Sequence, residues 1–274
     1  MMSGAESLRS LAVMLTIAAS LALRTALPAL ADSGSDPAEL ERTWAAAAVY
    51  VPADAEGYRR IGSAELPAVL AAHSAPVPAV VYAHGCAGID AAAVETGRFL
   101  AGAGYVVVAP DSFARASKPR SCDPDRNVGG LHREVLRWRQ EEIGHAIRML
   151  RATAPTKIGK VVLMGLSEGG IAVATFADQP VSARIIEGWT CHAGWPEYRG
   201  LAAPPNEAVL ALLAADDPWW RAPVFDGDCG AFMPSGGLSR SIVYVAPSPL
   251  HQNHWLSFDP SVRREILTFL ATPP

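Results

Sequence analysis

The segment Gly165-Leu166-Ser167-Glu168-Gly169 constrains the fold of this chain more than any other. It fits the pattern G-x-S-x-G and lies between an apolar run at residues 161–164 and a stretch of small residues at 170–176. A buried strand, a tight turn and a helix in this order expose a serine hydroxyl at the strand end, where it can act as a nucleophile. The glycines fit because the turn brings backbone segments too close for a Cβ atom. A glycine-rich turn without chemistry is the alternative.

The rest of the chain alternates between two kinds of segment. Short β-branched runs are followed by longer segments of helical period, which predicts an α/β fold: a mostly parallel sheet flanked by helices. Most of these runs are continuously apolar, as strands buried on both faces are. We expect strands at residues 77–83, 104–109, 160–164, 184–189, 208–213 and 241–245.

Two longer helices are expected from the same patterns. Residues 131–151 place apolar side chains on one face and charged side chains, Glu142 among them, on the other, as in a helix that crosses over a sheet. The last helix is expected to begin with Asp259 as N-cap and Pro260 in the first turn. Residues 32–44 show no such pattern and are expected to form a disordered leader.

A second glycine-containing loop, His84-Gly85-Cys86-Ala87-Gly88, follows the first expected strand. Loops of this H-G-x-x-G kind supply one wall of an oxyanion hole. The backbone N–H groups of Glu168 and of Cys86, or Ala87 in its place, are expected to point at the substrate carbonyl oxygen as it gains negative charge. His84 is expected to be a structural residue, partly buried and hydrogen-bonded within the loop.

A nucleophilic serine of this kind needs an acid and then a histidine farther along the chain. Asp216 and Asp217 follow one expected strand, and His251 and His254 follow the last one. Asp217 is favoured because its place before a Pro-Trp pair resembles the acid loop of many hydrolases, whereas Asp216 could serve as a loop cap. His254 is favoured because it lies six residues before Pro260, which leaves His251 as a loop residue.

Together these segments resemble the α/β-hydrolase superfamily and, within it, the dienelactone hydrolase family. The resemblance spans about residues 77–271 and is carried by segments 84–88, 105–113, 165–170, 217–219 and 251–255. It implies the α/β-hydrolase fold, a catalytic triad of Ser167, Asp217 and His254, and no cofactor. Founding dienelactone hydrolases have cysteine at the nucleophile position, where this chain has Ser167. An ordinary carboxylic ester hydrolase is therefore expected.

The first 31 residues are expected to be an export signal. Arg9 precedes an apolar run at residues 11–23, and Ala29-Leu30-Ala31 fits a signal peptidase cleavage site. An uncleaved membrane anchor is the alternative. After cleavage, residues 32–274 are expected to form a single periplasmic or secreted domain without a membrane partner.

The charge of the chain limits which classes of partner it is expected to bind. The chain has 23 basic and 27 acidic residues and a net charge of -4, which argues against nucleic acid as a partner. A small-molecule ester is expected instead.

The four cysteines are expected to form disulfides. Outside the cytosol they can pair in three ways, and we favour Cys191 with Cys229, a bond that would stabilise the fold by about 3–4 kcal/mol. There is no C-x-x-C pair, so no metal site is expected.

Several residues are open to two interpretations. Trp189, Trp195, Trp219, Trp220 and Trp255 flank the acid and histidine loops, where they are candidates for lining an apolar acyl or aryl pocket or for packing in the core. The segment that holds Arg115, Lys118 and Arg120 is expected to be a solvated loop, with carboxylate binding as the alternative.

Two other functions fit the same residues. An amidase or peptidase would use the same triad. An exported binding protein would keep the fold without turnover, although an intact Ser, Asp and His in this order favours an enzyme.

Overall fold

The computed structural model describes residues 36–54, 57–129, 132–235 and 237–271. The export signal at residues 1–31 lies outside these ranges, so it stays a prediction. Within the described ranges, no helix is both long and apolar enough to cross a membrane.

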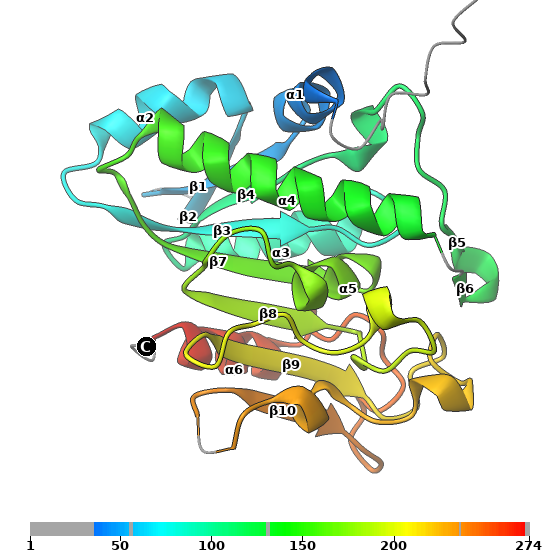
Figure 1. The fold of residues 1–274 in the computed structure, drawn as a ribbon. Helices are drawn as coiled ribbons and strands as arrows, with labels where there is room; N and C mark the ends of the chain where they lie inside the picture. Colours follow the sequence, from blue (N-terminus) through cyan, green and yellow to red (C-terminus); the bar gives the residue numbers. More distant parts are fainter. Residues whose placement is uncertain (1–35, 55–56, 130–131, 236, 272–274) are drawn as a thin grey trace, which may run out of the picture. The chain divides into compact units, whose positions relative to one another are not determined.

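An eight-stranded sheet runs through the described region in the order β10-β9-β8-β7-β3-β4-β1-β2 (Figure 1). Six of these strands pair in parallel, and they correspond to the six expected ones within a few residues at each end. The mostly parallel sheet is therefore confirmed. The six are β3 (Val77–Ala83), β4 (Val106–Ala109), β7 (Ile158–Leu166), β8 (Ala183–Glu187), β9 (Ala208–Ala214) and β10 (Arg240–Tyr244).

Two further strands lie at one edge of the sheet and were not predicted. β1 (Ala48–Ala53) pairs antiparallel with β4, and β2 (Gly57–Ile61) pairs antiparallel with β1. β2 is the edge strand and is mostly exposed, so it lacks the continuous apolar run of a buried strand. β1 does have such a run, its first four residues are buried, and it pairs with a strand on each side, so it was missed although its pattern is that of a buried strand. A separate two-stranded sheet joins β5 (Cys122–Asp123) to β6 (Val128–Gly129).

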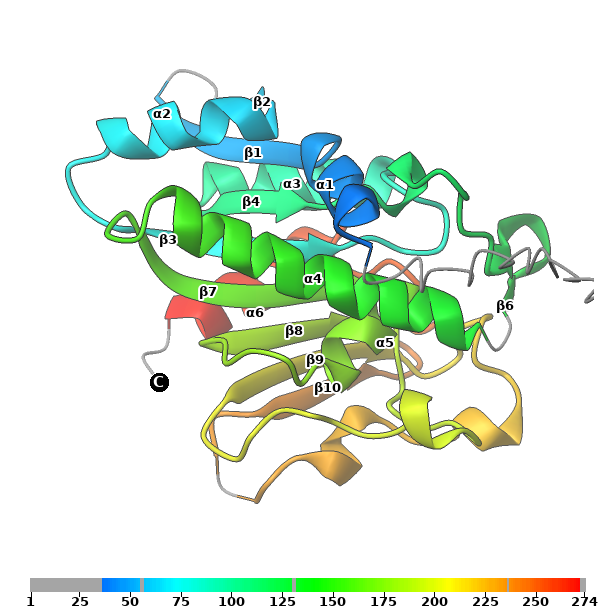
Figure 2. The same cartoon turned by 45° about the horizontal axis from the view of Figure 1, so that its top comes forward.

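Helices cover both faces of the large sheet (Figure 2). Strand side chains alternate between two apolar cores, with Val81 of β3 in one and Val80 in the other. The first core lies under α1 (Pro37–Ala45), α2 (Leu66–Ala72), α4 (Arg133–Thr153) and α5 (Glu168–Thr175). The second lies under α3 (Ala91–Gly102) and α6 (Pro260–Ala271).

Helix α1 shows that the disordered leader expected at residues 32–44 is wrong from Pro37 onward. Asp36 caps the helix by accepting a hydrogen bond from the N–H two residues farther on, and Pro37 occupies the first turn. Leu40 and Trp44 are buried. Burial of one apolar stripe on a short capped helix supplies the stability that the sequence pattern alone does not reveal.

Helix α4 confirms the predicted crossover helix but corrects its polar face. Glu142, expected on the exposed side, is only 3% exposed, and Arg139 is 2% exposed. The loop after β4 covers this part of the helix, and its Ser112 and Arg115 bind Glu142. Helical periodicity cannot anticipate this burial because the partners come from a distant loop.

Candidate active site

Ser167 lies in the sharp turn between β7 and α5, as predicted. Its backbone angles are φ 59 and ψ -120, in a region that non-glycine residues rarely adopt. The Ser167 N–H donates to the carbonyl of Glu187 on the neighbouring β8 at 2.9 Å. The turn is thus fixed to the sheet beside it.

Three glycines allow this turn to form. A Cβ atom at Gly165 would lie 2.3 Å from the Gly169 carbonyl oxygen, and one at Gly169 would lie 1.9 Å from that of Ala83. A Cβ at Gly170 would lie 2.8 Å from the Glu187 carbonyl oxygen. Any side chain here would push the start of α5 away from the strands below it.

The loop after β3 lies against this turn. A Cβ atom at Gly85 would lie 3.7 Å from the Cβ of Ser167. Cys86 and Glu168, whose N–H groups were expected to form an oxyanion hole, line the same cavity as Ser167. The structure therefore brings the three residues together around one space.

The loops after β9 and β10 form two Asp–His pairs. His254 Nδ1 donates to Asp217 Oδ2 at 2.7 Å, and His251 Nδ1 lies 2.7 Å from Asp216 Oδ2. The Asp217 side chain is 1% exposed and that of Asp216 is 59% exposed. The two residues favoured from the sequence, Asp217 and His254, are thus paired with each other, and theirs is the buried pair.

His254 packs against Gly188, the residue that follows β8. A Cβ atom at Gly188 would lie 3.3 Å from His254 Nδ1, and the Trp219 ring stacks on the imidazole at a centroid distance of 5.2 Å. Since Ser167 is bonded to Glu187, the serine and the histidine contact adjacent residues of one segment. Among the residues that the structure describes, no group hydrogen-bonds the buried Nε2 of His254.

Glu187 holds the histidine loop in place, a role that sequence analysis missed. Its Oε1 accepts the N–H groups of Leu256 and Ser257 at 2.6 Å each, and its Oε2 accepts the Ser257 hydroxyl at 2.9 Å. Burial raises the pKa of the Glu187 carboxyl, while the hydrogen bonds to Ser257 act in the opposite direction. The one sequence signal was an acidic residue within an expected buried strand.

A cavity of about 100 Å³ lies beside Ser167, and its walls are mostly aromatic. Trp189, Trp195, Trp219 and Trp220 line it, so the pocket interpretation holds for these four. It is wrong for Trp255. That indole donates to the Ser257 hydroxyl and packs against the ring of Phe258.

Beneath the loop after β3 lies a buried cluster of polar side chains. Arg139 Nη2 is 2.8 Å from Glu168 Oε1, and Arg139 Nη1 is 2.6 Å from His84 Nε2. His84 is fully buried and bonded to the Gly85 carbonyl, so the structural role expected for it is confirmed, with more complete burial. Burial, together with the Arg139 charge, lowers the pKa of His84 well below its ordinary value, so the ring stays neutral at neutral pH.

Arg115 extends this cluster, which corrects the solvated loop expected for it. Its Nε lies 2.5 Å from Glu142 Oε1, and its guanidinium lies 5.0 Å from the centroid of the Trp138 ring. Lys118 and Arg120 are exposed, as expected. Arg115 is thus bound to an internal carboxylate and does not line the cavity, which argues against its binding a substrate carboxylate.

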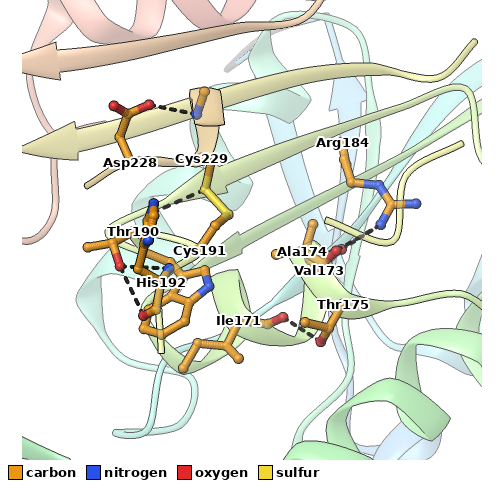
Figure 3. The surroundings of a disulfide bond; sticks show 12 residues. Ile171, Val173, Ala174, Thr175, Arg184, Thr190, Cys191, His192, Asp228 and Cys229 are labelled. Carbon is orange, nitrogen blue, oxygen red and sulfur yellow. Dashed lines mark hydrogen bonds between the residues drawn. A yellow bond between two sulfur atoms is a disulfide. The ribbon is translucent and has the colours of Figure 1, made fainter. Parts of the chain in front are cut away.

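The four cysteines form two disulfides, Cys86–Cys122 and Cys191–Cys229 (Figure 3 shows one of them). The second confirms the predicted pair. The first joins the loop after β3 to β5, and both of its cysteines line the cavity. Within the described ranges, no group of His, Cys, Asp and Glu side chains is arranged to hold a metal ion.

Solved structures with a similar fold include several hydrolases. A dienelactone hydrolase-like promiscuous phosphotriesterase, P91, from metagenomic libraries is 20% identical, with a TM-score of 0.50 over 72% of this chain and 85% of that one. The esterase Pf2001 of Pyrococcus furiosus is 15% identical, with a TM-score of 0.49 over 71% and 82%. The α/β serine hydrolase XC6422 of Xanthomonas campestris, which has no lid, is 14% identical, with 0.49 over 83% and 90%. At 20% identity, the similarity to P91 supports the fold and nothing beyond it.

No protein with a curated description matches the chain. Residues 66–219, more than half of its length, match the dienelactone hydrolase family. The match includes the loop after β3, the turn at Ser167 and the buried Asp217, and it ends before the histidine loop. The chain therefore belongs to the dienelactone hydrolase family and is a hydrolase with the α/β-hydrolase fold.

Proposed function

We propose that the chain is an exported esterase that cleaves carboxylic esters through an acyl-enzyme on Ser167. One observation carries this proposal: a serine in a strained turn opens onto an apolar cavity, and a buried Asp217–His254 pair packs against the segment to which that serine is bonded. A strained residue that the surrounding structure fixes in place is typical of a functional site.

The acid and histidine loops supply proton transfer in this mechanism. His254 Nε2 takes the proton of Ser167 as the hydroxyl attacks the ester carbonyl, and then gives it to the departing alkoxide. The same nitrogen next takes a proton from the water that hydrolyses the acyl-enzyme. Asp217 fixes the tautomer through His254 Nδ1–H and stabilises the imidazolium, and its second oxygen accepts the Trp219 N–H at 3.0 Å.

The backbone stabilises the negative charge of the tetrahedral intermediate. We assign this role to the N–H groups of Cys86 and Glu168, two residues that line the cavity together with Ser167. Donors of this kind stabilise the transition state because they are already oriented when charge develops. No cofactor takes part in this chemistry.

The walls of the cavity favour an uncharged substrate. Among the described residues that line it, Glu168 has the one ionisable carboxylate, which is already paired with Arg139, and none is Lys or Arg. Aromatic walls and a small volume suit a short acyl or aryl group. An anionic acyl chain would lose its hydration there without gaining a cation.

Export agrees with the cysteine chemistry of the chain. Each of the four cysteines is bonded to another, and stable disulfides are typical of oxidising compartments. We therefore place the mature protein in the periplasm or outside the cell.

A fluorophosphonate probe tests the nucleophile. The wild-type protein should be labelled on Ser167 and lose its activity against 4-nitrophenyl butyrate. Ser167→Ala should remain folded, escape labelling and lose kcat by about 10⁴- to 10⁶-fold. Ester turnover that persists in this variant would overturn the mechanism, and a wild-type protein that resists labelling would favour a binding protein without turnover.

Two matched substrates test the chemistry and charge of the pocket. 4-Nitrophenyl butyrate should be cleaved with a higher kcat/KM than the hemisuccinate, which has the same leaving group and a similar chain length but a terminal carboxylate. Butyryl 4-nitroanilide should be the poorer substrate for an esterase. Preference for the anilide would instead support an amidase.

A further inference from the structure

Arg139 is a buried cation that the fold itself does not require. It lies on α4 with 2% of its surface exposed, at a place where an apolar side chain would cover the core without the cost of desolvating a charge. Its guanidinium nevertheless contacts Glu168, His84, Ser112 and the carbonyl of Gly85. Three of these four residues, Glu168, His84 and Gly85, belong to segments that carry the expected oxyanion donors.

The first donor is fixed through its own peptide unit. The Gly85 carbonyl accepts from Arg139 Nη2 at 3.2 Å, from His84 Nδ1 at 2.7 Å and from the Gly88 N–H at 3.2 Å. In a planar trans peptide the carbonyl and the following N–H point in opposite directions. With the Gly85 carbonyl turned toward these buried donors, the N–H of Cys86 must point the other way.

His84 strengthens this arrangement because it stays neutral. A neutral imidazole has one donor and one acceptor nitrogen. With Nδ1–H donating to the Gly85 carbonyl, Nε2 is the acceptor, and it lies 2.6 Å from Arg139 Nη1 and 3.3 Å from the Ser112 N. Arg139 therefore binds the peptide unit both directly and through the imidazole.

The second donor is fixed through its side chain. Arg139 Nε and Nη2 both donate to Glu168 Oε1, at 3.0 and 2.8 Å, while the Ser121 hydroxyl binds Oε2. Glu168 is the first residue of α5 and directly follows Ser167. One guanidinium thus links the residue after the serine to the loop after β3.

We propose that Arg139 is a positioning residue that orients both backbone donors of the oxyanion hole, Cys86 N–H and Glu168 N–H. This inference rests on the proposed serine esterase function. Core packing alone does not explain why a charge is buried here. In this proposal Arg139 prevents the Gly85–Cys86 peptide from turning over and keeps the start of α5 in register with that peptide.

The chain offers a matched control at the other end of α5. Arg184 is also buried and paired with a glutamate, Glu207, and its Nη1 donates to the carbonyls of Val173 and Phe176 (Figure 3 shows Arg184 beside Val173 and Ala174). Arg184 does not line the cavity. Substitution of either arginine removes a buried ion pair at one end of the same helix, but only Arg139 contacts the oxyanion segments.

The test compares Arg139→Lys with Arg184→Lys by a readout specific to the oxyanion. A trifluoromethyl ketone adds to a catalytic serine and forms an oxyanion, whereas the matched methyl ketone binds mainly as the uncharged ketone. Arg139→Lys should lose about 10²-fold in kcat for 4-nitrophenyl butyrate, with KM changed less than about threefold. Affinity for the trifluoromethyl ketone should fall in parallel, and that for the methyl ketone should not. Arg184→Lys should lower Tm but keep both ketone affinities.

A second pair of variants keeps the inference testable should Arg139→Lys not fold. Glu168→Ala retains the Glu168 backbone N–H but loses its anchor to Arg139, so kcat and trifluoromethyl ketone affinity should fall together by about tenfold. Glu168→Gln keeps an acceptor oxygen for the guanidinium and should restore much of the loss.

Two results would overturn the inference. One is an unchanged trifluoromethyl ketone affinity in Arg139→Lys or Glu168→Ala; the other is an equal loss in Arg184→Lys. Failure of the serine mechanism would look different, because the wild-type protein itself would resist both the fluorophosphonate and the trifluoromethyl ketone.

Discussion

The two Asp–His pairs formed by the loops after β9 and β10 have the same hydrogen-bond distance and different surroundings. Both pairs join at 2.7 Å, yet the side chain of Asp216 is 59% exposed and that of Asp217 is 1% exposed. In the buried pair, aromatic rings cover His254, and the second oxygen of Asp217 is bonded as well. Hydrogen-bond length alone thus does not identify a catalytic pair, whereas burial and packing distinguish the two.

The exposed pair has a structural task of its own. Besides the side-chain contact, the Asp216 N–H donates to the His251 carbonyl at 2.8 Å, so this pair joins the loop after β9 to the loop after β10. Exposed ion pairs of this kind contribute about 0–1 kcal/mol to folding. We infer that the outer pair holds the two loops together and that the inner pair carries the chemistry.

The largest effect on activity should come from the histidines. His254→Ala should lower kcat by about 10⁴- to 10⁶-fold because it removes the general base, whereas His251→Ala should change kcat by less than about threefold. Steady-state kinetics with 4-nitrophenyl butyrate measure both variants. An equal or larger loss in His251→Ala would exchange the roles of the two pairs while leaving the reaction class intact.

The aspartates should follow with a somewhat smaller effect. Asp217→Asn should lower kcat by about 10²- to 10⁴-fold, since an amide cannot hold His254 in the productive tautomer or stabilise the imidazolium. Asp216→Asn should stay within about threefold of wild type and lower the unfolding free energy by less than about 1 kcal/mol. The reverse ranking would place the catalytic acid at Asp216.

Glu187 should show a still smaller effect on activity. Glu187→Gln keeps one acceptor oxygen for the histidine loop but puts an amide NH2 in place of the other and removes the carboxylate charge near His254. At a pH above the native pKa of Glu187, kcat should therefore fall about tenfold, equivalent to about 1.4 kcal/mol. Glu187→Ala also loses the anchor of the loop and should fall further. If both variants matched wild type in kcat, the buried pair would not depend on this anchor.

The pH dependence of stability provides an independent check on Glu187. Burial raises its pKa above the ordinary value of 4.5, so between 4.5 and the native pKa the folded protein holds a proton that the unfolded chain has released. This group therefore makes stability fall as pH rises through that window. Relative to wild type, Glu187→Gln should gain unfolding free energy as the pH rises through that window, as measured by urea denaturation at a series of pH values. A difference that does not vary with pH would contradict the assignment.

Sequence patterns identify the parts of this fold that rest on local regularity. The parallel strands β3, β4, β7, β8 and β9 have apolar runs because both of their faces are largely buried, and the turn at Ser167 is visible because its glycines are required by close packing. Strand β2 lies at an edge, where burial is partial and the pattern is weak, whereas β1 has a buried apolar run that went unpredicted. Helix α1 has a clear start at Asp36 but only a short apolar stripe.

The residues of the candidate site also fall into two groups, those with a local sequence signal and those without one. Chain order and loop placement bring out Ser167, the two aspartates and the two histidines. Local cues, the Pro-Trp pair after Asp217 and the spacing of His254 from Pro260, favour the two residues that the structure pairs, but nothing local shows that this pair is the buried one. Arg139 and Glu187 escape notice for a related reason: a charged residue in a helix or strand is normally exposed, and here both are buried by partners from distant segments. Long-range polar pairing leaves no periodic signal.

The smallest effect on activity should come from the disulfide near the inner pair. Cys229 Sγ lies 3.5 Å from the Trp189 carbonyl, and the Trp189 ring packs against Trp220, which in turn faces His254. The double variant Cys191→Ala/Cys229→Ala should lower the unfolding free energy by about 3–4 kcal/mol, because it releases a loop with a sequence separation of 38. Its kcat below the unfolding transition should stay within about threefold of wild type.

The other disulfide is the control for this last prediction. Cys86–Cys122 closes a loop of nearly equal separation, 36, so its removal should cost a similar unfolding free energy. Because it is attached to the loop that carries one proposed oxyanion donor, Cys86→Ala/Cys122→Ala should also lower kcat, although both backbone N–H groups remain. Denaturation and kinetics on the two double variants separate these effects. Equal losses of kcat below the unfolding transition would mean that the two disulfides support activity alike, and that the aromatic layer beneath His254 does not by itself keep the inner pair in place.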